Sequence, residues 1–206
     1  NAAHPVDARF LNGLRELCDQ HDVLLIIDET RITLGASGEP FTFASIADIA
    51  ADMVIASAGL FGGVSGGLIV ANQRTTGGPV KETSGFPLQA AVAAATLKAM
   101  HQQNLPRSIA DTSHEFAVAL AESLSEFEFI RDVHASGMTL GIEADIESAE
   151  LIQAAHSKGL RIEAAGETAF RLQLPLLVED DERDELLDKL KQAMELVQRE
   201  TASLGV

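Results

Sequence analysis

Residues 10–30 read FLNGLRELCDQHDVLLIIDET, and this stretch decides the expected fold class. Over residues 6–21, which we predict to be an amphipathic helix, apolar side chains recur on one face at Phe10, Leu14, Leu17 and Cys18. A continuous apolar run, residues 23–27, follows within two residues and ends in Asp28 and Glu29. A run without alternation is typical of a strand that is buried on both faces of a parallel sheet. A helix that leads directly into such a strand indicates an α/β layer.

The rest of the chain continues this alternation and then changes in character. Two more apolar runs, at residues 53–56 and 67–71, are predicted strands, and a glycine-rich segment separates them. Downstream, short strands are predicted at residues 138–143, 160–163 and 169–174, and helices at residues 87–100, 107–127, 148–158 and 181–200. A helix break at residues 104–106 places a domain boundary near residue 104, which divides the chain into residues 1–104 and 105–206.

The charge and the cysteine content limit the expected partners and the compartment. A net charge of −16 opposes both the phosphate backbone of nucleic acids and an anionic membrane surface. We therefore expect neither nucleic acid nor a membrane as a partner. Cys18 is the only cysteine, so no internal disulfide can form and a reducing cytoplasm is the expected compartment. The six histidines show no metal-type spacing, and no metal site is expected.

Asp28 stands at the carboxyl end of a predicted strand, where open α/β sheets place ligand-binding groups. Three roles are open for a carboxylate at this position. It could hold a metal together with Glu29, or it could be a solvated acid at the surface. It could also pair with a cationic heterocycle such as a protonated pyridine nitrogen. Position alone does not decide among these roles.

Several segments, taken in chain order, resemble those of class III, pyridoxal-phosphate-dependent aminotransferases, with the acetylornithine and ornithine branch as the nearest. Residues 10–30 resemble the family segment fLxxLRxLCdxxgxLLIxDEV. Residues 52–54 resemble the family segment P-D-I-V, and residues 84–88 resemble G-G-N-P-L. Residues 132–143 resemble dVRGxGLMxGIE, and residues 170–176 resemble xRLxPPL. The likeness covers nearly the whole chain and corresponds to the C-terminal half of such an enzyme.

This resemblance implies an α/β fold, a partial fold-type-I aminotransferase large domain followed by a small C-terminal α+β domain. Residues 1–104 would be the remnant of the large domain that binds pyridoxal phosphate (PLP), and residues 105–206 the small domain. Asp28 corresponds to the carboxylate that pairs with the pyridine nitrogen of PLP. Arg171 corresponds to the arginine that binds a substrate carboxylate, a role that suits a guanidinium fork.

The chain departs from the family at the position that decides catalysis. The family's Schiff-base lysine lies six residues after the Asp of P-D-I-V, and counting from Asp52 leads to Ala58. No lysine occurs among residues 1–80, whereas the chemistry requires a primary amine to hold PLP as an imine. The family's phosphate-binding threonine falls on Glu82, with Thr83 as the neighbouring substitute. We therefore expect no catalytic residue, and PLP contacts at Asp28 and Thr83 that are vestigial.

Three functions are compatible with these residues. The first, which we favour, is a truncated, non-catalytic homologue of an acetylornithine- or ornithine-type aminotransferase with a residual role in association. The second is a PLP-dependent transaminase that is completed by another chain or by a missing N-terminal half. The third is a small amino-acid-binding domain that uses Asp28 and Arg171. Because buried-type strands need cover on their edges and faces, we expect a homodimer or association with a related chain.

Overall fold

The computed structural model describes residues 6–57, 59–75 and 86–204, and the chain forms two compact units. The N-terminal unit comprises Val6–Ser108, and the C-terminal unit begins at Ile109. Helix α4 (Leu105–Leu124) continues across this boundary. Within the described ranges, no helix combines the length and the apolar character needed to cross a membrane.

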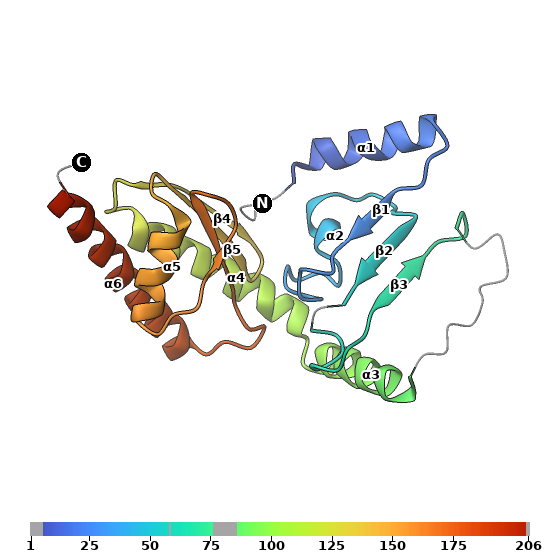
Figure 1. Cartoon of the computed structure of the whole chain (residues 1–206). Helices are drawn as coiled ribbons and strands as arrows, with labels where there is room; N and C mark the ends of the chain where they lie inside the picture. Colours follow the sequence, from blue (N-terminus) through green and yellow to red (C-terminus); the bar gives the residue numbers. More distant parts are fainter. Residues whose placement is uncertain (1–5, 58, 76–85, 205–206) are drawn as a thin grey trace. The chain divides into compact units, whose positions relative to one another are not determined.

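A three-stranded sheet forms the middle of the N-terminal unit (Figure 1). Its strands, in spatial order, are β1 (Ile26–Asp28), β2 (Met53–Ala56) and β3 (Leu68–Ala71). β1 pairs with β2 in parallel, and β2 pairs with β3 antiparallel. The helices of this unit before α4 are α1 (Ala8–Gln20), α2 (Thr42–Ile46) and α3 (Pro87–Gln102). In Figure 1, α1 lies above the sheet and α3 below it.

Local chemistry fixes the two ends of α1. The Oδ1 atom of Asp7 accepts a hydrogen bond from the backbone N–H of Arg9 at 2.6 Å, which satisfies a donor that the first helical turn leaves free. The helix ends at Gln20, and Asp22 follows with a left-handed φ of 51°, a conformation that Asp tolerates better than most residues. This turn directs the chain toward β1.

The apolar face that the sequence predicts for α1 is only partly covered. Leu11 is buried, and Leu14 is half-buried. Phe10 and Leu17, which belong to the predicted face, are exposed. The helix is therefore amphipathic as predicted, but within the described residues its apolar face is not a buried one.

The prediction that residues 23–27 form a strand buried on both faces is wrong in extent and in burial. The strand begins at Ile26, and Val23, Leu24 and Ile26 are exposed, Ile26 to 50%. The reason is that β1 is an edge strand, since β2 is its only partner among the described residues. Parallel strands are normally covered on both faces, so this end of the sheet presents apolar surface.

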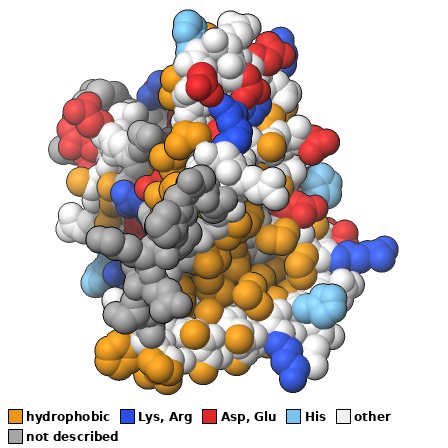
Figure 2. Space-filling model, turned by 90° about the vertical axis from the view of Figure 1, so that its right-hand side faces the viewer, with side chains coloured by type: hydrophobic (Ala, Val, Ile, Leu, Met, Phe, Trp, Pro, Cys, Tyr) orange, Lys and Arg blue, Asp and Glu red, His pale blue; other side chains and the backbone are white. Residues whose placement is uncertain are grey.

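The opposite side of the same unit is uncovered too. Ile69 of β3 is 63% exposed, and Val70 is also exposed. Near and on α3, the exposed apolar side chains are Phe86, Leu88 and Leu97. Figure 2 shows hydrophobic side chains gathered over the side of the molecule on which β3 and α3 lie. The sheet of the N-terminal unit therefore carries exposed apolar residues at both of its edges.

A four-stranded antiparallel sheet forms the C-terminal unit. Its strands, in spatial order, are β4 (Ile130–Ser136), β5 (Thr139–Ala144), β7 (Ala169–Gln173) and β6 (Glu163–Ala164). β4 and β5 form a hairpin whose turn contains Gly137 at a φ of 59°, which glycine adopts without steric cost. Besides α4, the helices of this unit are α5 (Ser148–Ser157) and α6 (Asp180–Leu204).

This second unit has a closed apolar core. Side chains that are 0% exposed come from the sheet and from the helices packed on it, and they include Leu140, Ile142, Phe170, Leu190 and Met194. Full burial of a side chain of this size contributes about 1.5–3 kcal/mol relative to exposure. On α6, the apolar residues Leu190, Ala193, Met194 and Val197 are buried, whereas Leu186 and Leu187, one turn earlier, are half-buried.

Candidate functional site

The carboxyl ends of β1 and β2 lie at the same edge of the N-terminal sheet, because the two strands are parallel and Asp28 is opposite Ile55. Ligand-binding groups of open α/β sheets concentrate at this edge. Ser57 follows β2 there, and its hydroxyl donates to the backbone carbonyl of Thr30 at 3.2 Å. This hydrogen bond connects the segment after β2 to the segment after β1, close to Asp28.

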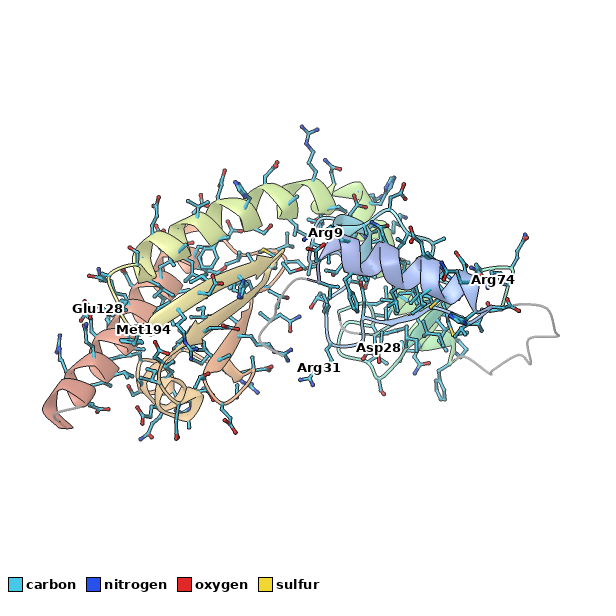
Figure 3. All side chains as sticks on the ribbon, turned by 90° about the horizontal axis from the view of Figure 1, so that it is seen from above. Arg9, Asp28, Arg31, Arg74, Glu128 and Met194 are labelled. Atoms are coloured by element: carbon cyan, nitrogen blue, oxygen red, sulfur yellow. The ribbon has the colours of Figure 1, made fainter. Side chains whose placement is uncertain are left out.

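Asp28 is an exposed carboxylate on β1 (Figure 3). The backbone N–H of Thr30 donates to its Oδ1 atom at 2.9 Å. This bond, together with one from the Thr30 side chain, holds the pKa of Asp28 below its ordinary value. The group is therefore ionised at neutral pH, and an anion of this kind can pair with a cation such as a protonated pyridine nitrogen.

The neighbouring carboxylate has a role in the fold. Glu29 is buried, and its two oxygens accept hydrogen bonds from the backbone N–H groups of Thr42 and Phe43, both at 2.8 Å. These residues begin α2, so Glu29 satisfies donors that the first turn leaves free. Both of its oxygens are thus engaged. Moreover, in the part of the chain that the structure describes, no group of three or more His, Cys, Asp or Glu residues could hold a metal ion.

Asp52, just before β2, connects three segments of the N-terminal unit. It is 1% exposed, and its Oδ2 atom accepts from the Leu25 N–H at 2.9 Å and from the Arg15 guanidinium at 2.8 Å. Its Oδ1 atom accepts from the Asn72 side chain at 2.9 Å. The Leu25 N–H, followed by Asn72 and Arg15, holds the pKa of Asp52 far below its ordinary value, against the opposing effect of burial. Removing such a carboxylate would leave its buried partners without an acceptor, which destabilises a fold.

Two arginines extend this cluster to the surface. Arg15 also contacts Asp19 at 2.9 Å, and Arg74 contacts Asp19 at 2.9 Å and Asp22 at 3.3 Å. Figure 3 shows Arg74 beside the C-terminal end of α1. Sequence reasoning missed this cluster, because Arg15 and Asp52 are 37 residues apart and no local pattern marks them as partners.

Arg171 lies on β7 of the C-terminal unit and is already paired. Its Nε and terminal nitrogen donate to one carboxylate oxygen of Glu163 at 3.0 and 2.6 Å. The two residues lie directly opposite each other in the pairing of β6 with β7. On the other side of Arg171, the register places Gly141 of β5 and then His134 of β4. Asp28 and Arg171 belong to different compact units.

Two further positions that the sequence singles out, Ala58 and Thr83, lie outside the described residues. The structure does describe Gly59, which follows Ala58 and has a φ of 76°. A Cβ atom at Gly59 would lie 2.5 Å from Cγ2 of Thr33. Glycine is therefore required here both for the backbone conformation and for the close approach of the segment after β1.

A pocket of about 270 Å³ lies beside β1 within the N-terminal unit. α1, β1, α2 and the segment after β1 supply its walls, which are apolar except for Asp28, Glu29 and Thr42. The apolar lining includes Leu11, Leu14, Ile26, Ile32, Phe43 and Ile46. Because both oxygens of Glu29 accept hydrogen bonds from α2, the pocket offers a ligand mainly apolar side chains, with the Asp28 carboxylate at its rim.

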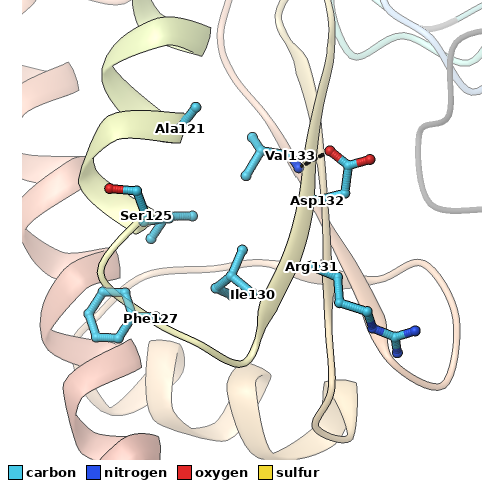
Figure 4. Close-up of a pocket in the computed structure, with 8 residues that line it drawn as sticks. Ala121, Ser125, Phe127, Ile130, Arg131, Asp132 and Val133 are labelled. Atoms are coloured by element: carbon cyan, nitrogen blue, oxygen red, sulfur yellow. Dashed lines mark hydrogen bonds between the residues drawn. The ribbon is translucent and has the colours of Figure 1, made fainter.

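A second pocket, of about 250 Å³, lies between the end of α4 and β4 (Figure 4). Its lining includes Ala121, Phe127 and Ile130. The Arg131 guanidinium is turned away from it and contacts Asp145 at 2.7 Å. Asp132 accepts a hydrogen bond from the N–H of the next residue at 2.8 Å. No acid–base chemistry follows from these groups.

The aminotransferase class-III family profile matches residues 3–194, and the chain belongs to this family. It is 30% identical to the acetylornithine aminotransferase of Bacillus subtilis over 93% of its own length and 50% of that protein. It is 29% identical to the acetylornithine aminotransferase of Methanothermobacter thermautotrophicus, over 88% of this chain and 47% of that protein. The chain thus spans about half the length of the curated relatives it matches.

Comparison with solved structures agrees with this family assignment. The N-acetylornithine aminotransferase from Stenotrophomonas maltophilia matches with a TM-score of 0.85 and 29% identity, over 96% of this chain and 54% of that one. The ornithine aminotransferase from Plasmodium yoelii, at 20% identity and a TM-score of 0.80, shares the fold. The expected resemblance and the expected fold class, part of a fold-type-I aminotransferase, are therefore confirmed.

The family is PLP-dependent, and among the described residues Asp28 is the expected cofactor contact that can be assessed. Asp28 is an ionised, exposed carboxylate at a strand end, and it suits a contact with the ring nitrogen. Covalent attachment requires a lysine, and residues 1–80 contain none.

Proposed function

We propose that this chain is a non-catalytic member of the class-III aminotransferase family whose role is association with another polypeptide. The observation that carries the proposal is the exposed apolar surface of the N-terminal unit. Ile26 is 50% exposed at one edge of its sheet, and Ile69 is 63% exposed at the other. Apolar surface of this kind marks interaction sites, and unpaired strand edges favour the addition of further strands.

The missing amine supports the non-catalytic half of the proposal. Aminotransfer on PLP needs a lysine both to hold the cofactor and to move a proton at the substrate carbon. By the resemblance of residues 52–54, that position is Ala58. A methyl group can do neither task, and no lysine precedes residue 81.

A second candidate is a PLP-dependent transaminase that is completed by another chain, and Asp28 is the observation that favours it. Its ionised carboxylate lies at the edge of the sheet where a ring nitrogen could be bound. Ala58 weakens this candidate, because the resemblance places the family's lysine in the half that this chain covers. The amino-acid-binding alternative has less support, since Arg171 is already paired with Glu163.

The test is the visible absorption spectrum of the purified chain with one equivalent of PLP, followed by borohydride reduction and mass analysis. We expect no imine band and no added mass. Lys81→Arg is the matched control, because Lys81 is the lysine nearest to position 58 in the sequence. A stoichiometric band that reduces onto one lysine would contradict the proposal. Loss of that band in Lys81→Arg would identify the lysine that has taken over.

A further inference from the structure

We infer that Asn12 is a site of spontaneous deamidation, and that the reaction proceeds only when the N-terminal part of α1 opens. The asparagines of the chain are Asn1, Asn12, Asn72 and Asn104, and of these only Asn12 precedes a glycine. Asn12 and Gly13 are both exposed on α1. This modification of the chain itself does not depend on the proposed role in association.

Deamidation at an Asn–Gly pair is an intramolecular reaction that consumes only water. The backbone nitrogen of Gly13 attacks the Cγ atom of Asn12, the bond between Cγ and Nδ2 breaks, and ammonia leaves with the proton of the Gly13 N–H. Water then opens the succinimide ring at one of its two carbonyls. Opening at Cγ gives aspartate, whereas opening at the backbone carbonyl gives isoaspartate, in which the chain continues through Cγ. Both products carry one more negative charge than asparagine.

The nitrogen of Gly13 is unhindered, because glycine has no Cβ. A Cβ built at this position would have no neighbour within 4 Å apart from its chain neighbours and the backbone of its own helix. The other asparagines of the folded part are less favourable. Asn104 is followed by the bulky Leu105, and the amide of Asn72 donates to the Asp52 carboxylate at 2.9 Å.

The helical conformation of α1 opposes the reaction. In an α-helix the N–H of each residue donates to the carbonyl four residues earlier, so the Gly13 nitrogen is engaged by Arg9 within α1. The succinimide ring can close only when the backbone of Asn12 leaves the helical range. The rate of deamidation therefore reports how often this part of α1 opens.

The N-terminal part of α1, residues 8–13, has few contacts that oppose opening. The structure describes every residue of α1, and Leu11 is the buried one among them. The ion pairs that join α1 to the rest of its unit start further along the helix, at Arg15 and Asp19. A glycine inside a helix weakens it, and a helix of 13 residues is marginal without packing. This segment therefore belongs to the part of the unit that opens most readily.

The product changes α1 and the pocket beside it. Isoaspartate adds an atom to the backbone path, which interrupts the regular hydrogen bonds of the helix. The new carboxylate also lies four residues before Glu16, and like charges at this spacing disfavour a helix. Leu11 and Leu14, on either side of the modified residue, line the pocket beside β1. Deamidation thus acts as an irreversible switch from a helical to an open segment at this pocket wall.

The experiment incubates the full 206-residue chain at neutral pH, once in buffer and once in denaturing urea. Trypsin cleaves after Arg9 and Arg15 and releases residues 10–15. The mass and the retention time of this peptide distinguish asparagine, aspartate and isoaspartate at position 12. Because a helix end opens at a free energy well below that of global unfolding, the rate in buffer should be about one tenth to one thousandth of the rate in urea. Asn72 and Asn104 should remain amides over the same period.

Two variants with the same substitution test the control by helix opening. Leu11→Ala removes the buried contact of α1 and should accelerate deamidation in buffer at least about tenfold. Leu17→Ala changes a 52% exposed residue of the same helix and should not accelerate it. Gly13→Ala should slow the reaction more than the fivefold, approximately, that helix stabilisation alone would give. In urea, Leu11→Ala and the wild type should react at the same rate.

Far-UV circular dichroism verifies that each variant folds. If Leu11→Ala unfolds the chain, Asp7→Ala replaces it, because it removes only the N-cap hydrogen bond to Arg9; it should accelerate deamidation about fivefold. Equal rates in buffer and in urea would show that α1 gives no protection. Equal rates in the folded wild type and the folded variant would show that opening of α1 is not the controlling step. Earlier conversion of Asn72 or Asn104 would overturn the assignment to Asn12.

Discussion

The two compact units of this chain differ in how completely they cover their apolar side chains. In the C-terminal unit, Leu140 and Phe170 are 0% exposed on the inner face of an antiparallel sheet. In the N-terminal unit, Ile26, Ile69 and Phe86 are exposed around a sheet that begins with a parallel pair. An antiparallel sheet needs cover on one face, whereas parallel strands need it on both. The helices of the C-terminal unit meet the first requirement, but those described in the N-terminal unit do not meet the second.

The N-terminal unit depends correspondingly more on polar contacts. Asp52 links Arg15 of α1, the Leu25 N–H before β1 and Asn72 after β3. Glu29 links the end of β1 to the start of α2. These contacts join segments that apolar packing does not fully enclose. The C-terminal unit thus has a closed core, whereas the N-terminal unit combines a buried core around Val54 and Leu60 with buried carboxylates and an open apolar surface.

The largest expected effect concerns two phenylalanines. Phe170→Ala removes a fully buried ring and should lower the free energy of unfolding by about 3–5 kcal/mol. Phe86→Ala removes a ring that is 71% exposed and should change it by less than about 0.5 kcal/mol. Urea unfolding followed by far-UV circular dichroism measures both, since the chain has no Trp or Tyr for fluorescence. Equal changes in the free energy of unfolding would contradict the difference in apolar burial between the two units.

A smaller effect is expected for the carboxylate that holds the N-terminal unit. Asp52→Asn should lower the stability of this unit by about 2 kcal/mol, because Arg15 loses a charged partner but keeps Asp19. Hydrogen exchange should accelerate in the peptides of α1 and β1 and remain unchanged in those of β5 and β7. Equal acceleration in both sets would show that the two units do not unfold separately.

The same variant gives the pH dependence. The pKa of Asp52 is lowered in the folded chain, so its contribution is fully present above the unfolded pKa of about 3.9 and is lost as pH falls toward the folded value. The stability difference between wild type and Asp52→Asn should therefore be constant from about pH 7 to pH 5 and shrink below about pH 4. A difference that does not change across this window would contradict the assignment.

The smallest effects concern the two helix starts. Glu29→Gln replaces a carboxylate that accepts two N–H groups of α2 with an amide that accepts one, and should cost about 1 kcal/mol. Ser148→Ala removes the hydroxyl at the start of α5 that donates to the Gly166 carbonyl at 2.8 Å, and should cost about 0.5 kcal/mol. Thermal unfolding of the two variants gives the order. The reverse order would show that the hydrogen bonds from Glu29 to α2 contribute less to stability than the hydrogen bond of Ser148 does.

Much of the secondary structure could be predicted from local patterns. The strand predicted at residues 53–56 has the same bounds as β2 (Met53–Ala56). The helix predicted to begin at Pro87 does begin there, as α3. β4 (Ile130–Ser136) was not predicted, because Arg131, Asp132 and His134 interrupt any apolar alternation. It is a strand because β5 pairs with it along its length. The five-residue α2 was also missed, since its start depends on Glu29, 13 residues before Thr42.

By itself, the sequence determined the family resemblance, the amphipathic character of α1, the position of Asp28 at a strand end and the absence of a lysine before residue 81. These are properties of residue order and of neighbours within one or two turns. Tertiary structure alone decided that Glu29 caps α2, that Asp52 joins Arg15 across 37 residues, and that β1 is an exposed edge. Such contacts depend on which distant segments pack together, and periodicity in a single segment carries no information about its partner.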